Sequence, residues 1–105
     1  MGREPGKPES EEALVELQWT SKAHDDLARL YAFLAKSSSK AAAKAVRALV
    51  SAPERLLSQP RLGETLEGFE PREVRRWLIG RYEMRYEIRG KTIFVLRIWH
   101  AREDR

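Results

Sequence analysis

The sequence contains no cysteine, and this absence removes several kinds of chemistry at once. A chain without thiols forms no disulfide, holds no thiolate zinc or iron–sulfur centre and offers no cysteine nucleophile. Its two histidines, His24 and His100, are too few for a polyhistidine metal site. We therefore expect no metal and no other cofactor, and the composition fits the reducing cytoplasm.

Long apolar runs are missing as well. No stretch approaches the ~18 apolar residues that a membrane-spanning helix needs, so a membrane is not an expected partner. The first ten residues are polar, include prolines and contain no apolar segment of the kind found in secretory signals. Glycine-rich phosphate-binding loops, a Ser-His-Asp order and paired-carboxylate motifs are also absent, so the common motifs of nucleotide-binding proteins and hydrolases do not apply.

Positive charge is concentrated in the last third of the chain. Residues 1–71 contain ten Lys and Arg against eleven Asp and Glu, whereas residues 72–105 contain ten against five. Nine of those last ten basic residues are arginines, whose planar fork matches carboxylates and phosphates. This predicts an anionic partner, either a nucleic acid or an acidic protein segment. The alternative is a solvated sheet face on which the arginines pair with Glu73, Glu83 and Glu87.

A length of 105 residues is that of one domain. Residues 1–12 carry Gly, Pro and charge without an apolar period, and we expect them to form a flexible tail. Residues 13–105 then form the single domain. Apolar and polar residues alternate loosely over Leu14–Trp19, which predicts the first strand of this domain.

Apolar residues at helical spacing next predict two helices. The first is capped by Thr20 or Ser21, and the second begins near Lys40. Pro53 lies inside the second apolar pattern, so a kink or restart is expected near Ser51–Pro53. Because the joint between the helices is short, they should form an antiparallel hairpin.

After Gln59–Gly63, apolar residues no longer recur at helical spacing. They recur at every second position, which is the pattern of strands. Val74–Ile79 predicts one strand, residues 81–89 alternate between charged and apolar side chains, and Ile93–Ile98 is apolar on both sides, as in a central strand. The helices should cover the apolar face of this meander and leave the Arg/Glu face open. The predicted fold class is α+β: an N-terminal strand and an antiparallel two-helix hairpin packed on one face of a small antiparallel sheet, in the order β-α-α-β-β-β.

The residues at the end of the chain suggest two kinds of site. A histidine exchanges a proton near neutral pH and arginines stabilise charge on a phosphate, which suits metal-independent RNA cleavage. The catalytic candidates for that reaction are His100, Arg102, Arg85 and Arg76. The alternative for His100 is a structural or partner-binding role. The candidates for binding a target or a partner protein are Arg75, Arg81, Arg85, Trp99, His100 and Arg102.

Arg75 and Arg85 either contact a partner or pair with Glu73 and Glu87. Trp99 serves as a packing residue or lines a groove. Arg97 stands inside an otherwise apolar strand, and we expect it to be buried and paired.

Three sets of residues form a recognisable pattern: Trp19–Thr20 with Ala23, Asp26–Leu27, Tyr31 and Phe33–Ala35; Gln59–Gly63; and Arg72–Arg75, Gly80–Tyr86 and Val95–Asp104. Through them, from about Leu14 to Arg105, the chain resembles the RelE/ParE superfamily of bacterial type II toxins. The resemblance implies the fold derived above and a toxin that inhibits growth and is neutralised by a cognate antitoxin. It also implies that operator DNA is bound only through the antitoxin.

The superfamily has two activities: RelE-like members cut mRNA on the ribosome, and ParE-like members inhibit DNA gyrase. The ending Leu96–Arg102 resembles the ParE side, although Arg102 falls where RelE-like members carry a catalytic arginine. Glu83 replaces the arginine that follows the glycine–tyrosine turn in RelE-like chains, and no tyrosine follows at the end. The resemblance therefore favours gyrase poisoning. The alternatives are a ribosome-dependent mRNA interferase and a binding module that has lost its toxicity.

Overall fold

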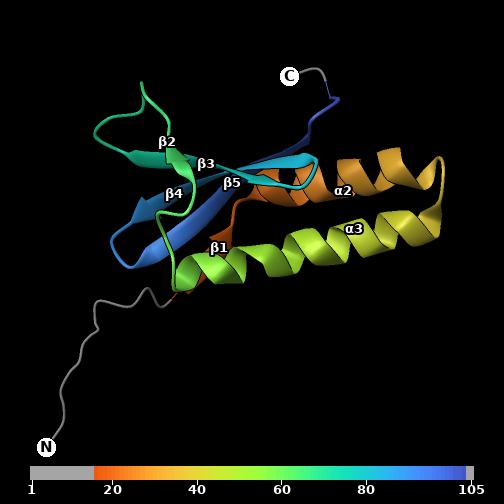
Figure 1. Ribbon diagram of the computed structural model, residues 1–105, viewed down its shortest axis with the longest axis horizontal. Coiled ribbons are helices and arrows are strands. Elements are labelled where there is room, and N and C mark those ends of the chain that lie inside the picture. The colour runs from red at the N-terminus through yellow and green to blue at the C-terminus, as the bar shows by residue number, and fades with distance from the viewer. Residues whose placement is uncertain (1–15, 104–105) are drawn as a thin grey trace, which may run out of the picture.

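Residues 16–103 are described by the computed structural model, and they form a helix pair beside a twisted sheet (Figure 1). The expected tail over residues 1–12 lies outside the described residues, as does the start of the first predicted strand. The elements are β1 (Glu16–Trp19), α2 (Ser21–Ala35), α3 (Ser39–Ser51), a 3₁₀ helix η1 (Ala52–Leu57), β2 (Glu64–Thr65), β3 (Glu73–Ile79), β4 (Tyr82–Arg89) and β5 (Thr92–His100).

Both helices begin where a hydroxyl caps them. The Thr20 side chain accepts a hydrogen bond from the backbone N–H of Ala23, and Ser38 accepts one from Ala41. The restart expected near Pro53 is confirmed, because α3 ends at Ser51 and η1 follows. Proline stands in the first turn of η1, where its missing N–H breaks no intrahelical hydrogen bond.

The strands form one mixed sheet in the order β1-β5-β4-β3-β2. The predicted α+β class and the order of elements are confirmed, but the sheet is not wholly antiparallel, because β1 pairs in parallel with β5. The two-residue strand β2, which the sequence did not predict, pairs with Arg75 and Arg76 of β3. The three long strands form the predicted antiparallel meander. Its two tight turns begin at Gly80 and Gly90, whose positive φ suits two-residue hairpins.

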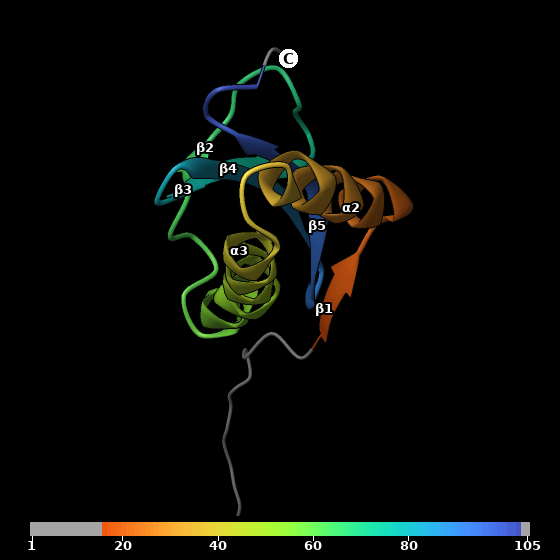
Figure 2. The same cartoon turned by 90° about the vertical axis from the view of Figure 1, so that its right-hand side faces the viewer.

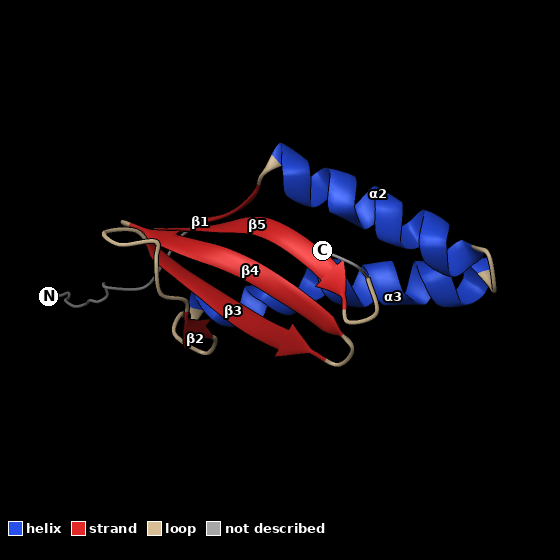
Figure 3. Cartoon of the chain, turned by 90° about the horizontal axis from the view of Figure 1, so that it is seen from above, coloured by secondary structure: helices blue, strands red, loops and turns tan. Residues whose placement is uncertain are grey.

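A β-bulge in β5 decides which residues share a face. Tyr86 pairs with Val95 but Arg85 pairs with Arg97, so Leu96 is an extra residue on β5. Beyond it, the alternation shifts by one position, and Ile98 takes the face of Val95 while Arg97 takes the opposite one. We call the face that packs on the helices the helix-side face and the opposite one the outer face. No described helix covers the outer face, as Figure 3 shows.

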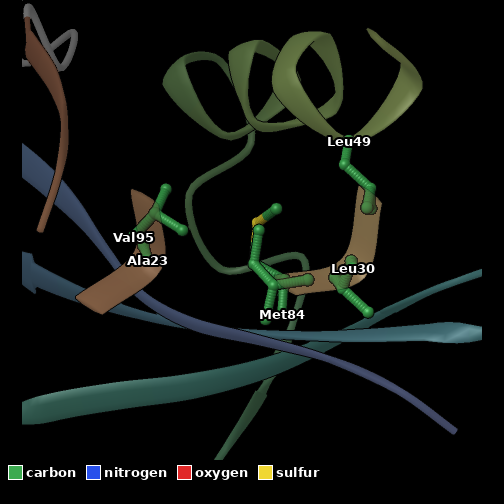
Figure 4. Packing of buried hydrophobic residues seen from close by; sticks show 6 residues of the cluster. Ala23, Leu30, Leu49, Met84 and Val95 are labelled. Atoms are coloured by element: carbon green, nitrogen blue, oxygen red, sulfur yellow. The ribbon is translucent and has the colours of Figure 1, made fainter. Parts of the chain in front are cut away.

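The main core lies between the helices and the helix-side face of the sheet (Figure 4). It joins residues from both helices and from strands β4 and β5: Ala23, Leu30, Leu49, Met84, Val95 and Ile98. In Figure 2, α3 lies under the helix-side face of the twisted sheet, whereas α2 lies alongside β5. Within residues 16–103, neither helix has the length and hydropathy to cross a bilayer.

Thr20 joins the start of α2 to the bulge. Its hydroxyl lies 3.1 Å from the carbonyl oxygen of Val95 and 3.0 Å from that of Leu96, and its backbone N–H also donates to Val95. One threonine hydroxyl therefore caps the helix and also binds two carbonyl oxygens at the bulge.

Replacing Thr20 with valine keeps the shape of the side chain and the backbone hydrogen bond to Val95, and it removes the hydrogen bonds made by the hydroxyl. We expect this to lower the free energy of unfolding by about 2 kcal/mol, because a cap and a partly buried hydrogen bond are lost together. Urea unfolding followed by circular dichroism measures the change. Ser38→Ala is the matched control because it loses only a cap, at about 1 kcal/mol. Equal losses in the two variants would contradict a role for Thr20 at the bulge.

Candidate functional site

Three arginines form a row across the outer face. The strand register places Arg76 of β3 opposite Arg85 of β4, and Arg85 opposite Arg97 of β5. We call these three residues the arginine row. Like charges in directly opposite positions repel each other, so a sheet tolerates such a row only with compensating groups.

The compensation is unequal along the row. Arg76 lies 3.1 Å from a carboxylate oxygen of Glu64, and Arg97 donates to Asp26 at 2.9 and 3.2 Å. The contact between Arg85 and Glu83 is longer, at 3.9 Å. Among residues 16–103, the only buried side-chain nitrogens or oxygens without a hydrogen-bond partner are the Nε atoms of Arg76 and Arg85. The row therefore has unused hydrogen-bonding capacity, most of all at its centre.

Aromatic rings hold the central arginine in place. The guanidinium carbon of Arg85 lies 4.8 Å from the ring centroid of Trp99 and 5.8 Å from that of Phe69. Arg97 lies 5.0 Å from the same Trp99 ring. Cation–π contacts of this kind fix the position of a guanidinium without occupying its N–H donors. Trp99 thus packs against two arginines of the outer face, which is the packing role of the two left open by the sequence, and it does not line the groove described below.

The expected open Arg/Glu face differs from a solvated one, because its carboxylates are buried. Glu87 is 2% exposed and accepts two hydrogen bonds from Arg72 and one from Arg89. The bond from Arg72 lowers the pKa of Glu87 below its ordinary value of 4.5, although burial acts in the opposite direction. Glu83 is also buried, next to the arginine row. The acids thus lie beneath a layer of guanidinium groups.

A groove of about 320 Å³ opens beside the centre of the row. Its walls come from the start of α2, the loop between β2 and β3, and strands β4 and β5. The lining residues are Thr20, Ser21, Lys22, Phe69, Arg72, Arg85, Leu96 and Arg97. They include four cations and no acid, so the groove suits a small anionic group.

Asp26 of α2 anchors one end of the row. It is 2% exposed, and its carboxylate accepts hydrogen bonds from Arg97, from Arg29 and, at 2.8 Å, from the backbone N–H of Ile98. Burial alone would raise the pKa of Asp26, but these hydrogen bonds outweigh it and hold the pKa below its ordinary value. The expected pairing of Arg97 is thereby confirmed, while its side chain stays 35% exposed rather than buried.

Stability should therefore fall in mild acid. The pKa values of Asp26, Glu73, Glu87 and Glu103 are all lowered by arginine hydrogen bonds, so their stabilising effect is complete above the ordinary carboxyl pKa values and is lost as pH falls through the lowered ones. We expect the free energy of unfolding to change little from pH 7 to about 5 and to decline between about pH 5 and 3. Urea unfolding across this range tests it. Glu87→Gln should flatten the decline, and an unchanged pH profile in that variant would contradict the assignment.

His100 lies away from the arginine row. It is paired with Tyr82 on the helix-side face and is 6% exposed, with its ring 5.1 Å from that of Tyr82 and 5.9 Å from that of Phe33 on α2. Its Nδ1 accepts a hydrogen bond from the backbone N–H of Arg102. Arg102 itself is exposed in the turn after β5. The four catalytic candidates are thus divided, with Arg76 and Arg85 on one face and His100 on the other.

The remaining binding candidates lie at opposite ends of the sheet. Arg75 is on the helix-side face, where it donates to a carboxylate oxygen of Glu73 and to the carbonyl oxygen of Gly63. Arg81 is exposed in the turn between β3 and β4, and its carbonyl oxygen accepts from Ala101. Of the six binding candidates, only Arg85 lines the groove, and Trp99 packs against it. The sequence did not predict that Lys22, Phe69, Arg72 and Leu96 would line a groove.

Residues 17–105 match the family model described as ParE toxin of type II toxin-antitoxin system, parDE. A solved structure described as a chromosomal ParDE TA system from P. aeruginosa is similar at 27% sequence identity and a TM-score of 0.70, covering 83% of this chain and 96% of that one. A chain of the toxin–antitoxin complex RelBE2 from Mycobacterium tuberculosis shares the fold at 24% identity and a TM-score of 0.56, covering 81% and 95%. No curated protein matches the chain significantly.

Proposed function

Because the chain belongs to the ParE toxin family of type II toxin–antitoxin systems, we propose that it arrests growth by poisoning DNA gyrase and that a cognate antitoxin neutralises it. The family match covers residues 17–105, nearly the whole chain. A partner antitoxin is supported by the structural neighbour described as a ParDE system. Gyrase as the target is favoured over mRNA by the arrangement of the candidate catalytic residues.

The separation of His100 from the arginine row carries this choice. Cleavage of RNA by its own 2′-hydroxyl needs a group that takes the proton and cations that hold the phosphate, all around the same bond. A phosphate bound at Arg85 would lie across the sheet from His100, which is buried against Phe33 and Tyr82. Tyr82 and Tyr86 also lie on the helix-side face. Over residues 16–103, the outer face therefore offers cations without a histidine or tyrosine to move the proton.

A supercoiling assay with purified gyrase tests the proposal. Micromolar toxin should inhibit the supercoiling of a relaxed plasmid and, after denaturation, leave linear DNA from trapped cleavage complexes. Addition of the antitoxin at an equal concentration should restore supercoiling. His100→Gln is a useful companion variant, because a gyrase poison does not need the histidine as an acid or a base. Full supercoiling at that toxin concentration would count against gyrase as the target.

The arginine row itself favours a second candidate, a ribosome-dependent mRNA interferase. Three adjacent guanidinium groups suit a phosphodiester, and Arg102 is exposed beside the end of β5. Under this alternative, primer extension on mRNA after induction shows cuts at fixed codon positions, and Arg102→Ala removes them. Intact mRNA in arrested cells would dismiss this candidate and leave the gyrase proposal standing.

A further inference from the structure

The groove beside the arginine row contains guanidinium groups in two different states. Arg72 donates two hydrogen bonds to Glu87, and Arg97 donates two to Asp26, so each already has a carboxylate on its fork. Arg85 has only a 3.9 Å contact with Glu83 and a buried Nε without a hydrogen-bond partner. Arg85 is therefore the guanidinium in the groove with the most unused hydrogen-bonding capacity.

Arg85 is also held ready for a ligand. Its guanidinium contacts the rings of both Phe69 and Trp99, and the side chain stays 31% exposed. A side chain already fixed in position loses little conformational entropy when it binds, and a fork of N–H donors accommodates a carboxylate through two parallel hydrogen bonds. The geometry of Arg85 thus suits one oxyanion of carboxylate or phosphate size.

The surroundings favour a peptide over a nucleic acid. A strand of RNA or DNA is bound through several phosphates, each neutralised by an available cation. In the groove, two of the four cations already hold buried carboxylates, which leaves Arg85 and Lys22. Phe69 and Leu96 add apolar surface beside them. One available guanidinium next to apolar walls fits an acidic side chain flanked by an apolar residue.

We infer that the groove is the docking site for an acidic segment of the antitoxin, in which an Asp or Glu carboxylate binds the fork of Arg85 and a neighbouring apolar side chain packs on Phe69 and Leu96. This inference rests on the proposed function for the identity of the partner, and it adds the chemistry and the place of recognition. The occupied groove would cover the centre of the arginine row, so an antitoxin bound there would block access of other anions to the outer face.

Binding of the purified cognate antitoxin to the toxin, measured by isothermal titration calorimetry, tests the inference. Arg85→Ala should weaken binding at least about 30-fold, because a charged hydrogen-bonded pair is lost. Arg85→Lys keeps a charge next to Glu83 and loses the fork, and it should weaken binding about 10-fold. Lys44→Ala removes an exposed cation from α3 and is the matched control, with less than about a twofold change. Circular dichroism establishes that each variant is folded.

Peptides of 15 residues that cover the antitoxin sequence then locate the segment. One acidic peptide should bind the wild-type toxin, and its Asp/Glu→Asn/Gln version should bind wild type more weakly. The Arg85→Ala toxin should bind both versions of the peptide with the same weak affinity. Antitoxin that binds Arg85→Ala and wild type with the same affinity would overturn the inference and leave the proposed function intact. Displacement of the peptide by a 12-nucleotide RNA whose own binding needs Arg85 would assign the groove to nucleic acid instead. No binding of the antitoxin to wild type would contradict both the inference and the antitoxin part of the proposed function.

Discussion

Gly63→Ala should lower the free energy of unfolding by about 3 kcal/mol, a loss of roughly 12–20 °C in melting temperature for a domain of this size. A Cβ on Gly63 would lie 2.6 Å from the carbonyl oxygen of Arg76 and 3.0 Å from a ring carbon of Tyr86. Neither neighbour can move freely, because the Arg76 carbonyl belongs to the backbone of β3 and the Tyr86 ring is fully buried. The loop would have to shift away from the sheet.

That shift would break the hydrogen bonds that hold the loop. The backbone N–H of Gly63 donates to the Tyr86 hydroxyl at 3.0 Å, and that hydroxyl donates to the carbonyl oxygen of Pro60 at 2.7 Å. Arg75 donates to the carbonyl oxygen of Gly63 at 2.6 Å. Gly68→Ala is the control, because Gly68 has a φ of +94° but nothing within 4 Å of an added Cβ, and it should cost only about 1 kcal/mol. Differential scanning calorimetry compares the two, and equal losses would contradict the steric account of Gly63.

Asp26→Asn should have the next largest effect, also about 3 kcal/mol of unfolding free energy. The substitution removes a buried charge that binds two guanidinium groups and the backbone N–H of Ile98. Breaking a buried ion pair from one side commonly costs ~3–5 kcal/mol, and we take the lower end because Arg29 and Arg97 are 40% and 35% exposed and can turn toward water. Chemical unfolding in urea measures the loss.

Two further results separate this account from a general effect of charge removal. Glu103→Gln breaks an ion pair with Arg29 outside the core and should cost about 1 kcal/mol or less. The Asp26→Asn variant should also lose most of the acid sensitivity that Asp26 contributes, since its carboxyl no longer titrates. An Asp26→Asn variant as stable as wild type would show that α2 does not depend on Asp26 to hold the end of β5.

The parts of the fold that could be predicted from the sequence are those determined by neighbouring residues. A hydroxyl before an apolar helical pattern marks the start of each helix. Thr20 is one of the two caps predicted for the first helix, and it is the one observed. Pro53 marks the change from α3 to η1, and Gly80 and Gly90 mark the hairpin turns. These signals act within a few residues and need no knowledge of the rest of the chain.

The pairing of distant segments could not be read in the same way. Glu16 of β1 pairs with Thr92 of β5, far along the chain, and β2 is too short to leave an apolar period. The bulge at Leu96 had the largest consequence, since a shift of one residue exchanges the faces of everything after it. Without the bulge, His100 would lie on the outer face and Arg97 on the helix-side face.

The candidate site was predictable in its chemistry more than in its layout. The density of arginines in the last third predicts an anionic partner, and Arg85 does line the groove, with Trp99 packed against it. The burial of Glu83 and Glu87 was not predictable, because alternation alone suggests that every charged side chain on an open face meets water. Which cation remains available depends on these buried acids, and so on the three-dimensional structure.

Induction of the toxin alone in growing cells tests most directly the claim that this chain acts on gyrase and does not cut RNA. Chromosome breaks and primer extension on abundant mRNA should be measured in the same culture. The account predicts filamentous cells with broken chromosomes, gyrase subunits linked to the broken ends, and mRNA of full length. Cuts at fixed codon positions in mRNA, with chromosomes intact, would contradict it.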